Sequence, residues 1–264
     1  MGDAPIGVFD SGIGGLTVLK ELLAHLPGET FVYFGDTARV PYGTKSAETV
    51  RRFCHENVRL LLDRGVKSVV VACNTASAEA LPMLQREFAL PIVGVIEPGV
   101  RAAVAASGSG RIGVIGTAGT IRSGAYQAGI RLLKENADIT AAPCPLFVPL
   151  AEEGWIDHPV TEMVAREYLN EFRTRDIDAL VLGCTHYPLL KSVISRVMGA
   201  SVELVDSAVE TAREMKRIIQ SEDIIGGGGS GNFSVILSDT SPTFEEIAQR
   251  FLGRDIPEIE LVSA

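Results

Sequence analysis

The 264-residue sequence predicts an α/β fold of two pseudo-symmetric lobes, each a mostly parallel sheet flanked by helices, with a functional cleft between the lobes. Short apolar, β-branched runs alternate with amphipathic stretches along the chain, which is typical of parallel sheets covered on both faces. The run IGVFDSGIGG at 6–15 is echoed by IGVIGTAGTI at 112–121. At a similar offset, VVVACNTAS at 69–77 is echoed by LVLGCTHYP at 180–188, so one half of the chain repeats the other.

The individual elements follow from the spacing of apolar residues. Short β-branched runs predict strands at 6–10, 30–36, 68–73, 91–96, 111–116, 179–184 and 201–206. Apolar residues at helical spacing predict helices at 15–26, 47–65, 76–88, 123–136, 161–175 and 207–220.

The two lobes are expected to meet near EPG at 97–99, which an Ala/Gly/Ser-rich stretch at 102–110 follows. This boundary gives a first lobe from residue 1 to 97 and a second from 98 to 206.

The remaining tail begins with a helix and then GGGGSG at 226–231, which predicts a flexible loop. FSVILSD at 233–239 predicts one more strand. A helix is expected at 241–253, with Ser241 as its N-cap and Pro242 at its first position. The strand and helix could extend the second lobe or return to the first, and the periodicity leaves both open.

Composition excludes several classes of partner. A net charge of −9 opposes nonspecific attraction to nucleic acid or anionic lipid. No basic segment precedes an apolar signal region, and no uncharged apolar stretch reaches about 18 residues. We therefore expect a cytoplasmic protein without membrane or direct nucleic-acid contacts. The four cysteines lack C-x-x-C spacing, which disfavours a metal site, and Cys54 and Cys144 are expected to be small buried residues.

Polar residues follow several predicted strands. Because ligands bind beyond the carboxyl ends of the strands in such sheets, these positions are candidate site residues. They are Asp10, Ser11, Asp36, Cys73, Asn74, Thr75, Thr117, Cys184, Thr185 and His186.

The two cysteines in repeated context are the most informative of these residues. Either alone is more often a small buried residue at a strand end. Together, Cys73 and Cys184 would place matched acid/base groups on opposite sides of one cleft, which suits racemisation without a carrier cofactor. A helix N-terminus after each strand would stabilise a thiolate and could also hold a substrate carboxylate.

Other residues predict supporting roles. Asp10 could accept a proton from Cys73 or from a substrate ammonium, and His186 could orient or protonate the Cys184 half of the site. The turn PYGTKS at 41–46 could fix a distal carboxylate through its N–H groups and the Tyr42 hydroxyl. GIGG does not match a dinucleotide fingerprint, and neither a Walker motif, a spaced metal cluster nor a strand-end lysine for pyridoxal phosphate is present.

Four motifs in this order resemble the cofactor-independent glutamate racemases of bacterial cell-wall synthesis, within the aspartate/glutamate racemase superfamily. They are GVFDSGIGGLTVL, YFGDTARVPYG, VVACNTASA and LVLGCTHYPLL. The resemblance implies that the segment from about 207 packs back on the first lobe, which then comprises 1–97 plus 207–264. It also implies interconversion of L- and D-glutamate for peptidoglycan synthesis, and a homodimer.

The resemblance implies a role for each matching residue. Cys184 would remove the proton from L-glutamate and Cys73 from D-glutamate, with Asp10 and His186 assisting. Asp36 and Glu152 match accessory polar residues. The positions implied to hold the carboxylates and amine are Asp10, Ser11, Tyr42, Gly43, Asn74, Thr75, Thr117, Thr185 and His186.

Three alternatives remain at this stage. Another racemase of the superfamily, such as an aspartate racemase, would share the two-cysteine arrangement. A regulatory binding protein on this fold is possible because some glutamate racemases inhibit DNA gyrase. A redox protein would require Cys73 and Cys184 to approach within roughly 6 Å between Cα atoms.

Overall fold

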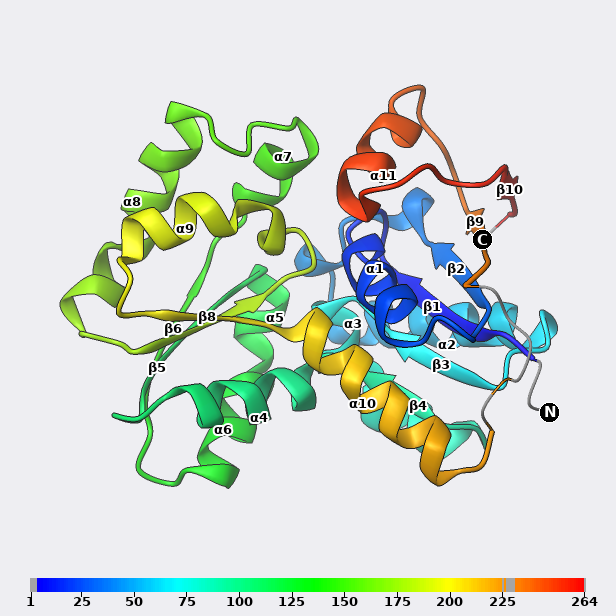
Figure 1. The fold of residues 1–264 in the computed structure, drawn as a ribbon, viewed down its shortest axis with the longest axis horizontal. Helices are drawn as coiled ribbons and strands as arrows, with labels where there is room; N and C mark the ends of the chain where they lie inside the picture. Colours follow the sequence, from blue (N-terminus) through cyan, green and yellow to red (C-terminus); the bar gives the residue numbers. More distant parts are fainter. Residues whose placement is uncertain (1–3, 225, 227–230, 264) are drawn as a thin grey trace.

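The computed structural model describes residues 4–224, 226 and 231–263, which form two parallel sheets lying side by side (Figure 1). The strands are β1 (Ile6–Asp10), β2 (Phe31–Gly35), β3 (Ser68–Val71), β4 (Ile92–Gly94), β5 (Arg111–Gly116), β6 (Asp138–Pro143), β7 (Ala179–Gly183), β8 (Glu203–Asp206), β9 (Phe233–Leu237) and β10 (Ile259–Leu261). One sheet has the order β10-β9-β2-β1-β3-β4 and the other β6-β5-β7-β8. All of these strand pairs are parallel.

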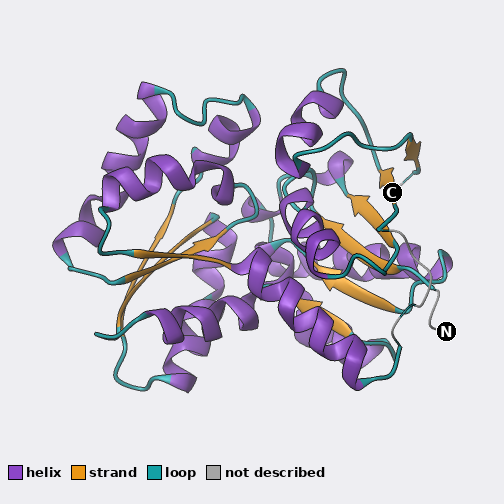
Figure 2. Cartoon of the chain, viewed as in Figure 1, coloured by secondary structure: helices purple, strands orange, loops and turns teal. Residues whose placement is uncertain are grey.

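Helices flank both sheets (Figure 2). The α-helices are α1 (Leu16–His25), α2 (Ala47–Asp63), α3 (Asn74–Glu87), α4 (Ile96–Ala106), α5 (Ala118–Ser123), α6 (Ala125–Leu133), α7 (Phe147–Glu152), α8 (Pro159–Thr174), α9 (Lys191–Met198), α10 (Ser207–Ser221) and α11 (Phe244–Leu252). Short 3₁₀ helices are η1 (Thr37–Arg39), η2 (Tyr42–Thr44) and η3 (Tyr187–Leu190). Within the described ranges, no helix is long and apolar enough to cross a membrane.

The two sheets share one strand order, which confirms the internal repeat. The order β2-β1-β3-β4 in the first sheet corresponds to β6-β5-β7-β8 in the second. Strand β1 is therefore equivalent to β5, and β3 is equivalent to β7. Because Cys73 follows β3 and Cys184 follows β7, the two cysteines occupy equivalent places in the two sheets.

The C-terminal strand returns to the first sheet. β9 pairs with β2, and β10 pairs with β9. Helix α10 packs on both α1 and α4 and lies between the two sheets (Figure 1). A single buried cluster contains Leu16 near the first sheet, Met215 of α10 and Leu180 of the second sheet, so the two halves share part of their core. From this pairing we propose lobes comprising 1–97 plus 207–264 and 98–206.

Several sequence-based expectations were wrong in detail. The stretch expected to be a lobe boundary is largely helical, because α4 runs through its alanines. Helix α11 begins at Phe244 with Thr243 at its N-cap, and Ser241 and Pro242 precede it. The peptide N–H of Phe244 donates to the Ser241 carbonyl at 3.0 Å, so these residues form a turn before the helix starts.

Other elements were not predicted at all. Strands β6 and β10 and helices α4, α5, α7 and α9 had no expected counterpart. The predicted helix at 123–136 ran through Gly124, which instead has a φ of +70° and separates α5 from α6. Most of the predicted glycine loop, at 227–230, lies outside the described residues.

Candidate active site

The carboxyl ends of the equivalent strands border one narrow cavity of about 60 Å³. Every predicted site residue except Asp10 and Asp36 lines it. These residues are Ser11, Tyr42, Gly43, Cys73, Asn74, Thr75, Thr117, Glu152, Cys184, Thr185 and His186. The rest of the lining comes from Gly12, Ile13, Val40, Pro41 and Val148. Cys73 and Cys184 both line the cavity. Each residue is only 6% exposed, so little solvent reaches either thiol.

Cys73 is the N-cap of α3, and its sulfur accepts the Ala76 N–H at 3.5 Å. This contact matches the predicted placement at a helix N-terminus. It does not produce a stabilised thiolate, however. Burial and the negative charge of Asp10 raise the pKa of Cys73 to about 12, against smaller opposing effects from Ala76 and Ser11. Cys73 is therefore a thiol at neutral pH, and it donates to the Ser11 hydroxyl at 3.6 Å.

Cys184 has a charged neighbourhood. Nδ1 of His186 lies 3.9 Å from the Cys184 sulfur, and Nε2 of the same ring lies 2.8 Å from Oε1 of Glu152. Burial alone would lower the pKa of His186, but its hydrogen bonds to Cys184 and Glu152 outweigh burial and raise that pKa to about 10. His186 is therefore an imidazolium at neutral pH, with one N–H directed at each partner.

Asp10 and Asn74 each have one buried side-chain polar atom without a partner among the described residues; Asn74 lines the cavity, and Asp10 precedes the lining residue Ser11. Oδ2 of Asp10 accepts the Gly12 N–H at 2.9 Å, whereas its Oδ1 has no partner among the described residues. Oδ1 of Asn74 accepts from the Tyr126 hydroxyl at 2.7 Å, whereas its Nδ2 has no partner in the same part of the chain. Buried polar groups are rarely unpaired. A free acceptor and a free donor together suit an ammonium and a carboxylate of one ligand.

The protonation of Asp10 reflects opposing influences. Burial raises its pKa, while the positive charge of His186 and peptide N–H groups from Gly12, Gly15 and Ser11 partly offset the rise.

Three threonines join the lobes at the edge of the cavity. The Thr75 hydroxyl lies 2.8 Å from that of Thr117 and 3.3 Å from that of Thr120. The turn at Gly43 packs so closely on this chain that a Cβ there would lie 2.8 Å from Cβ of Thr117. At this edge of the cavity the two lobes therefore meet through a small, hydroxyl-rich surface.

The hydroxyl of Tyr42, predicted to fix a carboxylate, is hydrogen-bonded to other side chains. It donates to Oδ2 of Asp36 and accepts from Nδ2 of Asn57 at 3.1 Å, so its proton is already committed. Asp36 is fully buried and also accepts from Nε of Arg39 at 2.8 and 2.9 Å and from Ser238 at 3.1 Å. Asp36 therefore positions the Tyr42 turn and does not line the cavity.

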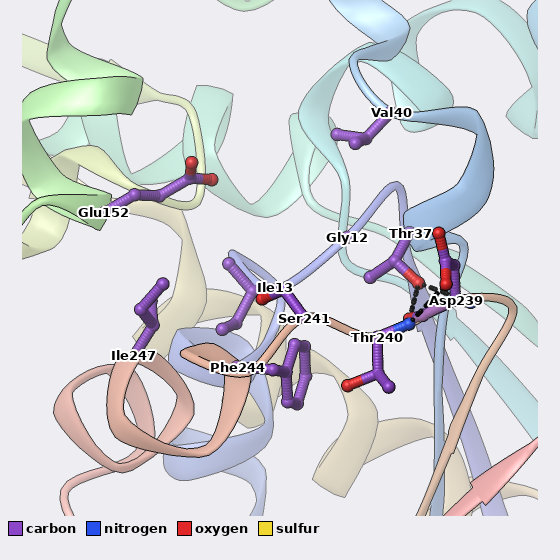
Figure 3. A pocket seen from close by; sticks show the side chains of 10 residues that line it. All are labelled: Gly12, Ile13, Thr37, Val40, Glu152, Asp239, Thr240, Ser241, Phe244 and Ile247. Carbon is purple, nitrogen blue, oxygen red and sulfur yellow. Dashed lines mark hydrogen bonds between the residues drawn. The ribbon is translucent and has the colours of Figure 1, made fainter.

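A larger cavity of about 230 Å³ adjoins the first and shares Gly12, Ile13, Val40 and Glu152 with it (Figure 3). Its other wall comes from Phe244 and Ile247 on α11 and from the segment after β9. There the peptide N–H of Asp239 donates to the Thr37 hydroxyl at 2.9 Å. This outer cavity and the narrow cavity therefore meet at these shared residues.

Sequence reasoning missed the residues that hold the site in place. Tyr126 and Asn57 lie in helical patterns and Arg39 in the connection after a strand, with no local sign of their contacts. Ser238 could have been recognised as a candidate site residue, because it directly follows an apolar strand. The described residues contain no group of three or more histidines, cysteines or carboxylates able to hold a metal ion. Cys54 and Cys144 are buried and free, as the other two cysteines are.

Comparison with known proteins gives consistent similarities. A family model described as Asp/Glu/Hydantoin racemase matches residues 6–215. A glutamate racemase from Geobacter metallireducens is 52% identical over 259 residues, covering 98% of this chain and 96% of its own. The crystal structure of a Bacillus anthracis glutamate racemase isoform superposes with a TM-score of 0.94 at 39% identity, covering 99% of this chain and 98% of the other. A Francisella tularensis glutamate racemase in complex with D-glutamate gives 0.94 at 37% identity, covering 100% and 98%.

Proposed function

We propose, since the chain belongs to the Asp/Glu/Hydantoin racemase family, that it interconverts L- and D-glutamate by a two-base mechanism without a cofactor. One observation carries the proposal: the thiols of Cys73 and Cys184 follow equivalent strands of two related sheets and open onto the same cavity. The α-carbon of a substrate held between them can lose its proton to one sulfur, and the planar carbanion that forms can gain a proton from the other thiol on the opposite face.

The polar atoms around the cavity match the groups of an amino dicarboxylate. Nδ2 of Asn74 with the Thr75 and Thr117 hydroxyls suits the α-carboxylate, and the unpartnered Oδ1 of Asp10, a residue next to the lining residue Ser11, suits the α-ammonium once substrate is bound. Because the Tyr42 hydroxyl is committed to Asp36, the distal carboxylate falls to the peptide groups of the Tyr42–Gly43 turn. The D-glutamate bound by the Francisella relative supports this ligand class.

The protonation of His186 and Cys73 suits turnover of L-glutamate. The imidazolium of His186 faces the sulfur of Cys184, which acts as the thiolate base in the proposed cycle. Cys73 enters as a thiol and delivers its proton to the opposite face. For D-glutamate the two cysteines exchange roles, so their protonation must first be reversed.

Donors held in place around the α-carboxylate would stabilise the negative charge that develops as the α-proton leaves. Because the cavity is enclosed by two lobes, water is largely excluded and these interactions are stronger than they would be in solution. The buried charge of Asp10 opposes a thiolate at Cys73, and a substrate ammonium bound to Asp10 would relieve that opposition.

The substrate assignment is tested by following optical activity with L-glutamate, D-glutamate, L-aspartate and D-aspartate, without added cofactor. We expect glutamate to racemise from both sides with equal kcat/KM, because enantiomers have the same free energy in solution. Aspartate is one methylene shorter and cannot span both carboxylate sites, so its kcat/KM should be lower by about 10- to 100-fold. Faster turnover of aspartate, or none of glutamate, would overturn the assignment.

The family resemblance also supports three further parts of the proposal. These are a role for the D-glutamate product in peptidoglycan synthesis, a cytoplasmic location and a homodimeric assembly.

A further inference from the structure

Helix α11 contacts the Glu152–His186 pair from across the interlobe boundary. Nη1 of Arg250 donates to the main-chain carbonyl of Glu152 at 2.8 Å. The ring of the next residue, Phe251, meets the His186 ring edge-on, with 5.1 Å between centroids and an interplanar angle of 81°. Figure 3 shows α11 beside the outer cavity and Glu152 reaching in from α7. Two successive residues of the C-terminal segment thus touch the acid/base pair of the other lobe.

The Arg250 contact lies at the C-terminus of α7, where a main-chain carbonyl lacks a hydrogen-bond partner within the helix. Glu152 is the last residue of this six-residue helix, and carbonyls at a helix C-terminus lack partners within the helix. A cation there also interacts favourably with the helix dipole. Nη1 of Arg250 meets both needs, since it donates a hydrogen bond and brings positive charge to this end.

Gly154 lets the guanidinium come close. Its φ of +73° is the left-handed conformation, and a Cβ at this position would lie 2.8 Å from Cζ of Arg250. The guanidinium therefore sits directly against the chain two residues after Glu152. Arg250 therefore restrains the segment from 152 to 154 at the C-terminus of α7.

We propose that Arg250 is a positioning residue for the Cys184 half of the site: by fixing the main chain at Glu152, it keeps the Glu152 carboxylate on His186 and His186 on Cys184. The chain of contacts runs from Nη1 of Arg250 to the Glu152 carbonyl, and from Oε1 of Glu152 to the imidazole at 2.8 Å. This role rests on the proposed racemase function. It means that the C-terminal helix α11 helps to position the groups around Cys184, one of the two proposed catalytic thiols.

The charged groups that face His186 define a readout that does not require turnover. Glu152 faces it from α7, Cys184 from its own loop and Asp10 from β1. If Arg250 holds Glu152 in place, Arg250→Met should weaken the Glu152 contact and lower the pKa of His186 from about 10 toward the ordinary value of 6.5. NMR titration of the histidine ring protons measures this in the ligand-free protein, with the His186→Gln variant assigning the signal.

The kinetic readout separates the two halves of the site. In Arg250→Met we expect kcat/KM to fall by about 10- to 100-fold in both directions. Proton transfer at Cys184 then limits the rate, so the α-deuterium isotope effect should grow for L-glutamate and shrink for D-glutamate. A general loss of packing would slow both transfers and leave the ratio of the two isotope effects unchanged.

Two further variants complete the experiment. Glu246→Gln removes the surface partner that Arg250 contacts at 3.2 Å and leaves the Glu152 contact in place, so neither readout should change. Gly154→Ala keeps Arg250 but displaces its guanidinium. It should therefore reproduce both the lower pKa of His186 and the diverging isotope effects. Thermal unfolding of each variant shows whether the fold is retained, and Gly154→Ala decides the question if Arg250→Met does not fold.

The outcomes are distinct. A lower His186 pKa together with diverging isotope effects supports the proposal. An unchanged His186 pKa and an unchanged isotope-effect ratio in folded Arg250→Met and Gly154→Ala would overturn it. If the wild-type protein does not racemise glutamate, the proposed function fails, while the titration still shows whether Arg250 acts on His186.

Discussion

Replacing either Cys73 or Cys184 with serine is expected to lower kcat/KM for glutamate racemisation by about 10²- to 10⁴-fold, the usual contribution of a positioned general acid or base. A serine hydroxyl occupies nearly the same place but is a much weaker acid than a thiol. Each variant should lose the same factor in both directions, because the equilibrium constant between enantiomers is one. Initial rates from each enantiomer measure this directly.

The same two variants should differ in their isotope effects. In Cys184→Ser, proton removal from L-glutamate becomes the slow step, so the α-deuterium isotope effect rises for L-glutamate and falls toward one for D-glutamate. Cys73→Ser should show the opposite pattern. Cys54→Ser, at a buried cysteine outside the cavity, serves as the control and should keep the wild-type pattern. If both site variants raised the isotope effect for the same enantiomer, the assignment of one thiol to each face would be wrong.

Asp10→Asn is expected to lower kcat/KM by about 100-fold, because the substrate ammonium loses its buried counter-charge. The same change should lower the pKa of Cys73 from about 12, because the negative charge of Asp10 is one of the causes that raise it. Cys73 thiolate would then form at lower pH although catalysis is slower. Alkylation of Cys73 against pH, followed by peptide mass spectrometry, measures the shift.

Asp157→Asn is a suitable control for this pair of effects. Asp157 is an exposed carboxylate that pairs with Arg196 on the surface, so neither the alkylation profile nor the racemase rate should change. An unchanged alkylation profile in folded Asp10→Asn would show that the carboxylate does not control the Cys73 thiol.

The positions of the main site residues could be predicted from the sequence because they follow a local rule. Asp10 ends an apolar strand, and Cys73, Thr117 and Cys184 each lie one or two residues after one; the carboxyl ends of parallel strands meet at one edge of a sheet. The internal repeat then predicted equivalent positions for Cys73 and Cys184, although the sequence does not give the distance between their thiols.

The protonation of Cys73 could not be predicted in this way. Its position at the N-terminus of α3 suggested a stabilised thiolate, and that contact is present. The deciding influences are burial and the carboxylate of Asp10, which lies far away in the sequence and comes close only in the folded sheet. Similarly, Tyr126 reaches Asn74 from the other lobe, and Arg250 reaches Glu152 from the C-terminal segment.

The errors in the fold have local causes. No helix was predicted in the stretch after EPG, which contains glycine and serine and was interpreted as a lobe boundary, but its alanines are strong helix formers and α4 passes through them. Strand β6 was missed because it is short of β-branched residues and only one of its side chains is fully buried. Strand β10 has three residues and no buried position, which leaves little pattern to detect.

The most direct test of two-base catalysis is to follow the α-position by NMR during the first turnovers of L-glutamate in D₂O. A thiol carries one proton, so Cys184 can return to L-glutamate only the proton that it removed, while Cys73 delivers a solvent deuteron to the other face. The account predicts D-glutamate labelled at Cα and remaining L-glutamate that is unlabelled. Deuterium entering the remaining L-glutamate as fast as product forms would contradict it, because that result requires a single base that exchanges with solvent and acts on both faces.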